Sequence, residues 1–119
     1  MNGKELGKRG EDAAAEFLCS HGYRILARNY RVACGELDIV ARQRETLVFV
    51  EVKTRRGDRC GTPGQSVTWR KQQKIIRTAQ WYLQEHHLDQ VPCRFDVIEV
   101  FPYPARAWNV RQIQGAFEA

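Results

Sequence analysis

The sequence predicts one α/β domain in which a mixed central sheet is flanked by helices. Three observations lead to this fold class. The chain has 119 residues, the usual length of a single domain. Helical and strand-like periodicities follow one another in the order α-β-β-β-α-β-β. Finally, 43% of the residues are hydrophobic and 28% are charged, a composition that excludes the disordered and fibrous classes.

The first half of the chain predicts a helix and then three strands. Residues from about 3 to 21 carry apolar and small residues at helical spacing, and the predicted stripe is Leu6, Gly10, Ala13, Phe17 and His21. Residues 23–30 alternate imperfectly and predict a strand. Residues 35–42 and 47–54 are stronger strands. A polar tetrapeptide of hairpin-loop length joins them.

The second half predicts a loop, a helix and two strands. Glycine and proline mark residues 55–66 as an irregular loop. A helix is expected from about 67 to 87, with Ser66 as its N-cap, and its predicted core stripe is Ile75, Ile76, Ala79, Tyr82 and Leu83. Strands are expected at 93–101 and around 107–113, because β-branched and aromatic residues dominate there.

The longest apolar run is Leu47–Val50, far short of the roughly 18 residues that suggest a membrane span. The N-terminal residues lead into a charged amphipathic stretch rather than a secretion signal. We therefore expect a cytoplasmic protein that has no membrane partner.

Positive charge is concentrated in one segment of the chain. Residues 53–77 contain eight basic residues and one acidic residue, a net charge of +7, whereas the whole chain carries +5. The other residues therefore sum to −2. A basic segment on a near-neutral domain suits a polyanion, most commonly nucleic acid. A solvated basic face explains the charge alone equally well.

The hairpin between residues 35 and 54 has a register that the sequence specifies. If Arg42 pairs with Leu47, one face becomes wholly apolar, as a buried face requires; it consists of Leu37, Ile39, Ala41, Val48, Val50 and Val52. The opposite face then places Asp38 directly across from Glu51. Like charges at this position, roughly 5 Å apart, destabilise a sheet.

A hard divalent cation between Asp38 and Glu51 would relieve this repulsion, because Mg²⁺ is usually held by one or two carboxylates together with water and phosphate oxygens. Lys53 lies two residues beyond Glu51 on the same face. Such a cluster suits phosphodiester hydrolysis, with the metal polarising the phosphate and Lys53 orienting the attacking water. The alternative is a solvated face on which Glu36 pairs with Lys53.

The same residues resemble a known catalytic core. Residues 35–38, Gly-Glu-Leu-Asp, followed by residues 49–53, Phe-Val-Glu-Val-Lys, look like the D…ExK core of the PD-(D/E)xK nuclease superfamily. That superfamily includes restriction endonucleases and archaeal Holliday junction resolvases. Segments covering nearly the whole chain also resemble the YraN-like family of small bacterial proteins. They are residues 9–13, 22–26, 28–31, 35–41, 49–55, 66–68, Lys71 and 94–97.

The resemblance implies a restriction-endonuclease-like α-β-β-β-α-β core and a Mg²⁺ or Mn²⁺ site formed by Asp38 and Glu51, with Lys53 as the catalytic lysine. By similarity to the junction resolvases, Glu11 would be a further acidic metal ligand. From the residues alone, Glu11 is a surface residue of the first helix. Lys71 matches a family position and is expected to contact phosphate.

These expectations combine into a metal-dependent, resolvase-like endonuclease that acts on DNA, branched DNA included. Phosphate contacts position DNA without reading its sequence, so we expect selectivity for structure; the predicted contacts are Arg55, Arg56, Arg59, Arg70, Lys71, Lys74 and Arg77. A homodimer would supply the two sites that two-strand cleavage needs. One alternative is a non-catalytic nucleic-acid-binding module with the same fold. Another is an adaptor for an acidic protein, with Trp69 and Trp81 as anchors.

Overall fold

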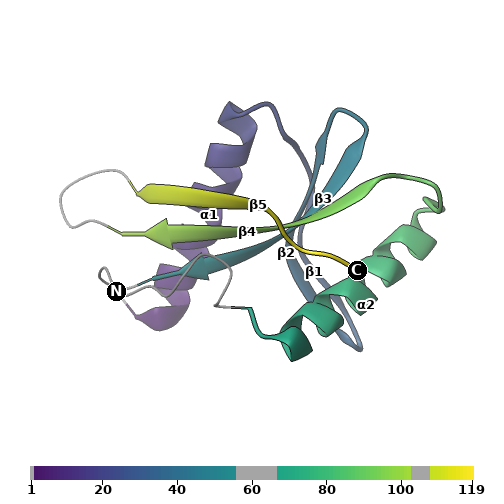
Figure 1. Cartoon of the computed structure of the whole chain (residues 1–119). Helices are drawn as coiled ribbons and strands as arrows, with labels where there is room; N and C mark the ends of the chain where they lie inside the picture. The colour runs from purple at the N-terminus through teal and green to yellow at the C-terminus, as the bar shows by residue number, and fades with distance from the viewer. Residues whose placement is uncertain (1, 56–66, 103–107) are drawn as a thin grey trace.

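The computed structural model describes residues 2–55, 67–102 and 108–119, and it contains a five-stranded sheet with one helix on each face (Figure 1). The elements in chain order are α1 (Gly3–Ser20), β1 (Arg24–Val32), β2 (Gly35–Gln43), β3 (Thr46–Thr54), α2 (Trp69–Glu85), β4 (Cys93–Phe101) and β5 (Asn109–Phe117). The predicted α/β class and element order are confirmed. The last strand was expected around 107–113, and it runs from Asn109 to Phe117.

The strands lie in the sheet in sequence order, β1-β2-β3-β4-β5. Only β3 and β4 are parallel neighbours, and α2 lies in the connection between them, as a parallel crossover requires. The mixed character of the predicted sheet therefore comes from one βαβ unit, with the antiparallel strands β2 and β1 on one side and the antiparallel strand β5 on the other.

The predicted hairpin register is confirmed where β2 and β3 pair, from Ile39 opposite Val50 to Gln43 opposite Thr46. The predicted extension of this pairing to Asp38–Glu51, Leu37–Val52 and Glu36–Lys53 is wrong. Leu37 packs in the cluster on the α2 side of the sheet and not with Ile39 and Ala41. Beyond Ile39 the two strands no longer pair, because the Asp38 carboxylate (Oδ2) accepts the backbone N–H of Val52 at 2.8 Å. The hairpin thus opens at Asp38.

The two helices cover opposite faces of the sheet (Figure 1). Side chains of a strand alternate between its faces, so β3 sends Val48 and Val50 towards α1 and Phe49 towards α2. By the same alternation, Glu51 and Lys53 follow Phe49 on the α2 face. The hydrophobic packing that fixes α2 therefore also fixes the surroundings of these two charged residues.

The buried face of α1 differs from the predicted stripe. Its buried residues are Gly10, Ala14, Ala15 and Leu18, so the prediction is correct at Gly10 and wrong for the full burial of Leu6, Ala13, Phe17 and His21. The physical reason is close packing: a Cβ atom at Gly10 would overlap the hydroxyl of Thr54. Small residues on this side let the helix lie against the sheet beside the buried Leu18, and the apolar side chains of Leu6 and Phe17 lie at its margin.

In α2 the predicted core is confirmed, since Ile75, Ile76, Ala79 and Tyr82 are buried and Leu83 is half-buried against them. The predicted N-cap, Ser66, is wrong. Thr68 takes this role, and its side-chain hydroxyl accepts the backbone N–H of Lys71 at 3.2 Å. Within the described residues, neither helix is long and apolar enough to cross a membrane.

Candidate functional site

A cavity of about 360 Å³ lies where β2 and β3 separate, between α1 and the first turns of α2. It is lined by Glu11, Gly35, Glu36, Asp38, Glu51, Val52, Lys53, Lys71, Lys74 and Ile75. All four predicted catalytic or metal-binding residues, which are Glu11, Asp38, Glu51 and Lys53, therefore face one cavity. Two of the predicted DNA contacts, Lys71 and Lys74, join them there.

Asp38 owes its position to the opening of the hairpin. Its Oδ2 atom holds the Val52 N–H, while β3 continues to pair with β4 as far as Thr54. The β3 strand therefore stays in the sheet, and β2 turns away from it at Asp38. A short polar side chain here both replaces a backbone acceptor and opens the space that becomes the cavity.

Glu51 lies at the centre of the charge network. Its side chain is only 8% exposed, and its Oε2 atom lies 2.6 Å from the Lys71 ammonium and 3.7 Å from the Lys53 ammonium. Sequence reasoning placed Lys71 on the DNA-contacting surface and missed this contact with Glu51. Nothing in the local sequence reveals the contact, because it depends on how α2 packs across the sheet.

The pKa values show a crowded acidic site. Burial, followed by the nearby charge of Glu51, raises the pKa of Asp38 to about 7. Burial also raises the pKa of Glu11, more than the Arg28 guanidinium lowers it. Asp38 and Glu11 therefore hold protons more tightly than usual, which is the condition that a bound cation would relieve.

Lys53 shows the opposite effect. Burial, then the hydrogen bond and positive charge of Lys71, lowers the pKa of Lys53. For Lys71, burial also acts against the charged form, but the hydrogen bond to Glu51 prevails and raises its pKa. The two lysines of the site therefore differ in how tightly they hold their protons. Lys71 is held as an ammonium on Glu51, and Lys53 gives up its proton more readily than an ordinary lysine.

Glu11 reaches the cavity because α1 packs tightly against the end of β3. Gly10 makes this contact at Thr54, and the next residue, Glu11, is half-buried at the cavity wall. The structure thus brings Glu11 to the hairpin, as the resemblance to the resolvases implies. The interpretation from the residues alone, a surface helix residue, does not account for this position.

No group of three or more His, Cys, Asp or Glu side chains in the described ranges is arranged to hold a metal ion. The donors that face the cavity are nevertheless carboxylate oxygens, the ligands preferred by Mg²⁺. They fit a cation that takes one or two protein ligands and completes its shell with water and phosphate oxygens. Glu11 would join this set only after a shift of side chains.

The other predicted DNA contacts divide into three groups. Arg70, Lys74 and Arg77 are exposed on α2. Arg55 lies 3.4 Å from Glu99, a fully buried carboxylate that also has Arg111 at 3.6 Å. Sequence reasoning missed Glu99, although an acidic residue between the apolar residues Ile98 and Val100 of β4 was a usable signal. The remaining two, Arg56 and Arg59, lie outside the described residues.

Residues 94–97, which the sequence resemblance includes, have a structural role. Asp96 is fully buried and accepts hydrogen bonds at 2.9 Å from Arg94, Gln112 and the backbone N–H of Gly115. The bonds from Gln112 and Gly115 tie β4 to β5. Asp96 does not line the cavity that contains Asp38 and Glu51.

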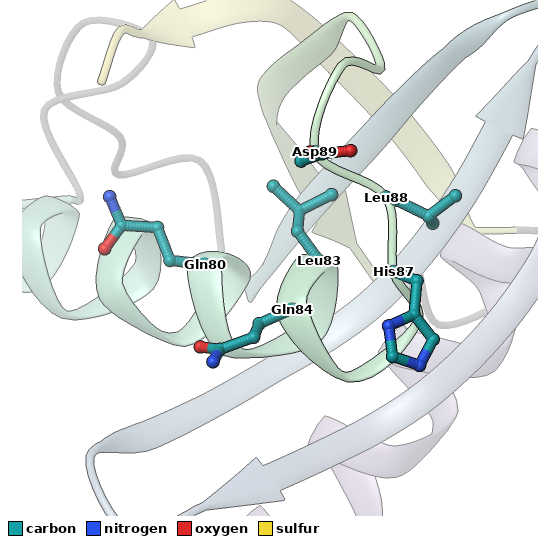
Figure 2. Close-up of a pocket in the computed structure, with 6 residues that line it drawn as sticks. All are labelled: Gln80, Leu83, Gln84, His87, Leu88 and Asp89. Atoms are coloured by element: carbon teal, nitrogen blue, oxygen red, sulfur yellow. The ribbon is translucent and has the colours of Figure 1, made fainter.

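A second hollow, of about 460 Å³, lies at the C-terminal end of α2 (Figure 2). Its lining comes from α2 and from the turn that follows it, and comprises Gln80, Leu83, Gln84, His87, Leu88 and Asp89. None of the predicted catalytic or metal-binding residues faces it. The chemistry that the sequence predicts therefore belongs to the smaller cavity.

Comparisons with known proteins identify the group to which the chain is similar. The sequence profile described as "Uncharacterised protein family UPF0102" matches residues 10–100. A UPF0102 protein of Symbiobacterium thermophilum is 53% identical over 116 residues, covering 98% of both chains. One from Syntrophotalea carbinolica is 51% identical, covering 95% of this chain and 91% of its own. One from Clostridioides difficile is 43% identical, covering 98% and 100%.

Among solved structures, the chain is similar to Pyrococcus furiosus SfsA in complex with Ca²⁺. The match has a TM-score of 0.37 and 14% identity, and it covers 91% of this chain and 62% of that chain.

Proposed function

The chain belongs to the uncharacterised protein family UPF0102, in agreement with its YraN-like resemblance, and we propose that it is a Mg²⁺- or Mn²⁺-dependent endonuclease that hydrolyses phosphodiester bonds in DNA. One observation carries the proposal. Glu11, Asp38, Glu51 and Lys53 come from three elements and line a single cavity beside a basic helix. Clustered carboxylates with shifted pKa values mark functional sites more often than they mark surfaces.

Asp38 and Glu51 would hold the metal, because they supply hard oxygen donors at the point where the hairpin opens. When bound, a divalent cation supplies a Lewis acid that polarises a phosphate and lowers the pKa of a water molecule. The residues fit such an ion because burial, and after it the negative charges of Glu51 and Glu11, raise the pKa of Asp38, and a cation would offset the cost of ionising it.

The lysines would serve the reaction differently. Lys53 has a lowered pKa, so it can accept a hydrogen bond or a proton from the attacking water. Lys71 keeps its charge and lies within 2.6 Å of Glu51. In this position Lys71 orients the Glu51 carboxylate and offers a positive charge to a phosphate oxygen at the cavity mouth.

DNA is the proposed substrate because the cavity opens beside α2, whose described residues include four basic side chains and one acidic side chain, Glu85. Phosphate contacts of this kind give affinity without sequence readout. The proposed enzyme is therefore selective for DNA structure rather than for base sequence, and branched DNA belongs among its candidate substrates.

One observation favours a second function, that of a non-catalytic nucleic-acid-binding module. The Lys71 ammonium already neutralises Glu51 at 2.6 Å, so the fold needs no metal to satisfy this carboxylate. In this alternative the same basic helix binds nucleic acid, and the carboxylates contribute only to the structure.

A cleavage assay distinguishes the two functions. Purified protein is incubated with linear duplex, single-stranded and four-way-junction DNA, with Mg²⁺, Mn²⁺ or EDTA. If the protein is an endonuclease, it should cut DNA only in the presence of the metal. The cleavage rate should fall on the order of 100-fold or more in Lys53→Ala. Lys8→Ala, which removes an exposed lysine of α1, is the matched control and should cut normally. Binding without any cutting would establish the module instead.

A further inference from the structure

The exposed side of α2 carries a stripe that leads away from the cavity. Arg70, Lys74, Arg77 and Trp81 recur at intervals of four, three and four residues, which places them on one face of a helix. All four side chains are exposed, and Lys74 also lines the cavity. With a rise of about 1.5 Å per residue, the stripe extends about 17 Å along the helix axis.

The stripe is positively charged and has few competing contacts. None of the salt bridges among the described residues involves Arg70, Lys74 or Arg77. The uncharged residues Gln73, Gln80 and Gln84 adjoin the stripe. These three cations are therefore available to a polyanion over about two turns of the helix.

Trp81 ends the stripe with a large aromatic surface. It is 52% exposed, whereas a tryptophan on an amphipathic helix is usually part of the core. The aromatic and cation–π contacts among the described residues do not include it. Both faces of its ring are therefore free of aromatic or guanidinium partners from this part of the chain.

We propose that the stripe of Arg70, Lys74, Arg77 and Trp81 binds a single-stranded segment of DNA, with Trp81 stacking on an unpaired base. Positive side chains that follow a backbone, together with an aromatic platform for bases, form the common design of single-strand binding surfaces. A base inside a duplex is covered by its neighbours and cannot stack on Trp81. The choice of DNA as the ligand rests on the proposed function, and the stripe adds a preference for unpaired strands.

Binding without metal tests this inference separately from cleavage. The full chain in EDTA is titrated into a fluorescein-labelled oligo(dT) and, in parallel, into a blunt duplex of the same length. Trp81→Ala should weaken oligo(dT) binding roughly 5- to 100-fold and duplex binding by less than about twofold. Trp81→Tyr, which keeps a stacking ring, should retain most of the affinity. Trp69→Ala, which removes the other exposed tryptophan of α2 outside the stripe, is the control.

The fluorescence of Trp81 gives a second readout that needs no destabilising change. Trp108 also emits, so the emission of Trp81 is taken as the difference between Trp69→Phe protein and Trp69→Phe/Trp81→Phe protein. Oligo(dT) should quench this difference, and polyglutamate, a polyanion without bases, should not. In the binding titration, an equal loss of affinity for oligo(dT) and for duplex in Trp81→Ala would overturn the inference. Quenching by polyglutamate as strong as by oligo(dT) would also overturn it and would indicate a surface for acidic proteins. Loss of cleavage alone, with these results intact, would overturn only the proposed function.

Discussion

Asp38 joins the geometry of the sheet to the chemistry of the site. Its Oδ2 atom accepts the Val52 N–H, which ends the β2–β3 pairing, and its carboxyl group faces the cavity beside Glu51. A residue of this kind cannot be removed without moving the backbone. The substitution Asp38→Asn keeps an acceptor for the Val52 N–H and loses the negative charge, so it separates the two roles.

The first prediction concerns the pH dependence of metal binding. The pKa of Asp38 is about 7 in the folded protein and 3.8 ordinarily. Between these two pH values, the folded chain therefore binds more protons at Asp38 than the unfolded chain does. This residue's contribution to the free energy of unfolding therefore falls as pH rises from about 4 to about 7. A cation that binds the ionised carboxylates opposes this loss.

Thermal melting should therefore show a larger Mg²⁺-induced rise in Tm at about pH 8 than at about pH 5. Asp38→Asn should reduce this difference. A rise that is equal at both pH values, or that persists unchanged in Asp38→Asn, would show that Mg²⁺ binds elsewhere.

The second prediction concerns the two lysines on Glu51. The hydrogen bond and charge of Lys71 help to lower the pKa of Lys53, so Lys71→Ala should raise the pKa of Lys53 towards its ordinary value. NMR titration of the lysine side-chain nitrogens measures this shift. Lys74→Ala removes a cavity lysine that has no salt bridge to Glu51 within the described residues, and it should change the pKa of Lys53 much less. If the pKa of Lys53 were unchanged in Lys71→Ala, the proposed coupling between the two lysines would be contradicted.

At the scale of elements, the contact between α1 and β3 decides whether Glu11 reaches the cavity. A Cβ atom at Gly10 would overlap the Thr54 hydroxyl, so Gly10→Ala must push the helix away or displace Thr54. We expect Gly10→Ala to lower the free energy of unfolding by about 1–3 kcal/mol. Urea denaturation measures this change.

Gly7 provides the matched control, because it lies in the same helix and a Cβ atom there would meet nothing within 4 Å. Gly7→Ala should stabilise the protein by up to about 1 kcal/mol through helix propensity. If the two substitutions gave the same change, the close approach at Thr54 would not be what fixes α1.

The sequence predicted the elements whose positions depend on local pattern. The β2–β3 register followed from a hairpin face that is apolar only in one alignment, and the core of α2 followed from its periodicity. The opening of the hairpin at Asp38 was not predictable, because it depends on a side chain that replaces a backbone acceptor. The Lys71–Glu51 contact was missed for a similar reason, since it joins residues of two elements that meet only in the fold.

At the scale of the whole molecule, the net charge of +5 is the sum of acidic and basic groups that lie in different places. The acidic residues Glu11, Asp38 and Glu51 gather in the cavity, while basic side chains line α2 beside it. A polyanion approaching this side meets positive charge first and carboxylates only at the cavity. This arrangement suits a substrate whose phosphates are held along the helix and presented to the acidic site.

This arrangement predicts a strong dependence of DNA affinity on salt. The logarithm of the binding constant should fall linearly with the logarithm of salt concentration, and Arg77→Ala should reduce the slope by about 0.7–0.9, the value for one lost phosphate contact. Arg24→Ala, which removes an exposed arginine of β1, should leave the slope unchanged. Affinity that is insensitive to salt would contradict the assignment of α2 to phosphate binding.

The central claim is that the cavity of Asp38, Glu51 and Lys53 performs metal-dependent phosphodiester hydrolysis. The most direct test is the initial rate of DNA cleavage as Mg²⁺ is titrated into wild-type protein and into Asp38→Asn, with circular dichroism to show that both are folded. We predict a rate that saturates with Mg²⁺ in the wild type and is lower on the order of 100-fold or more in the variant. Equal rates in the two proteins, or cleavage by the wild type in EDTA, would contradict the claim.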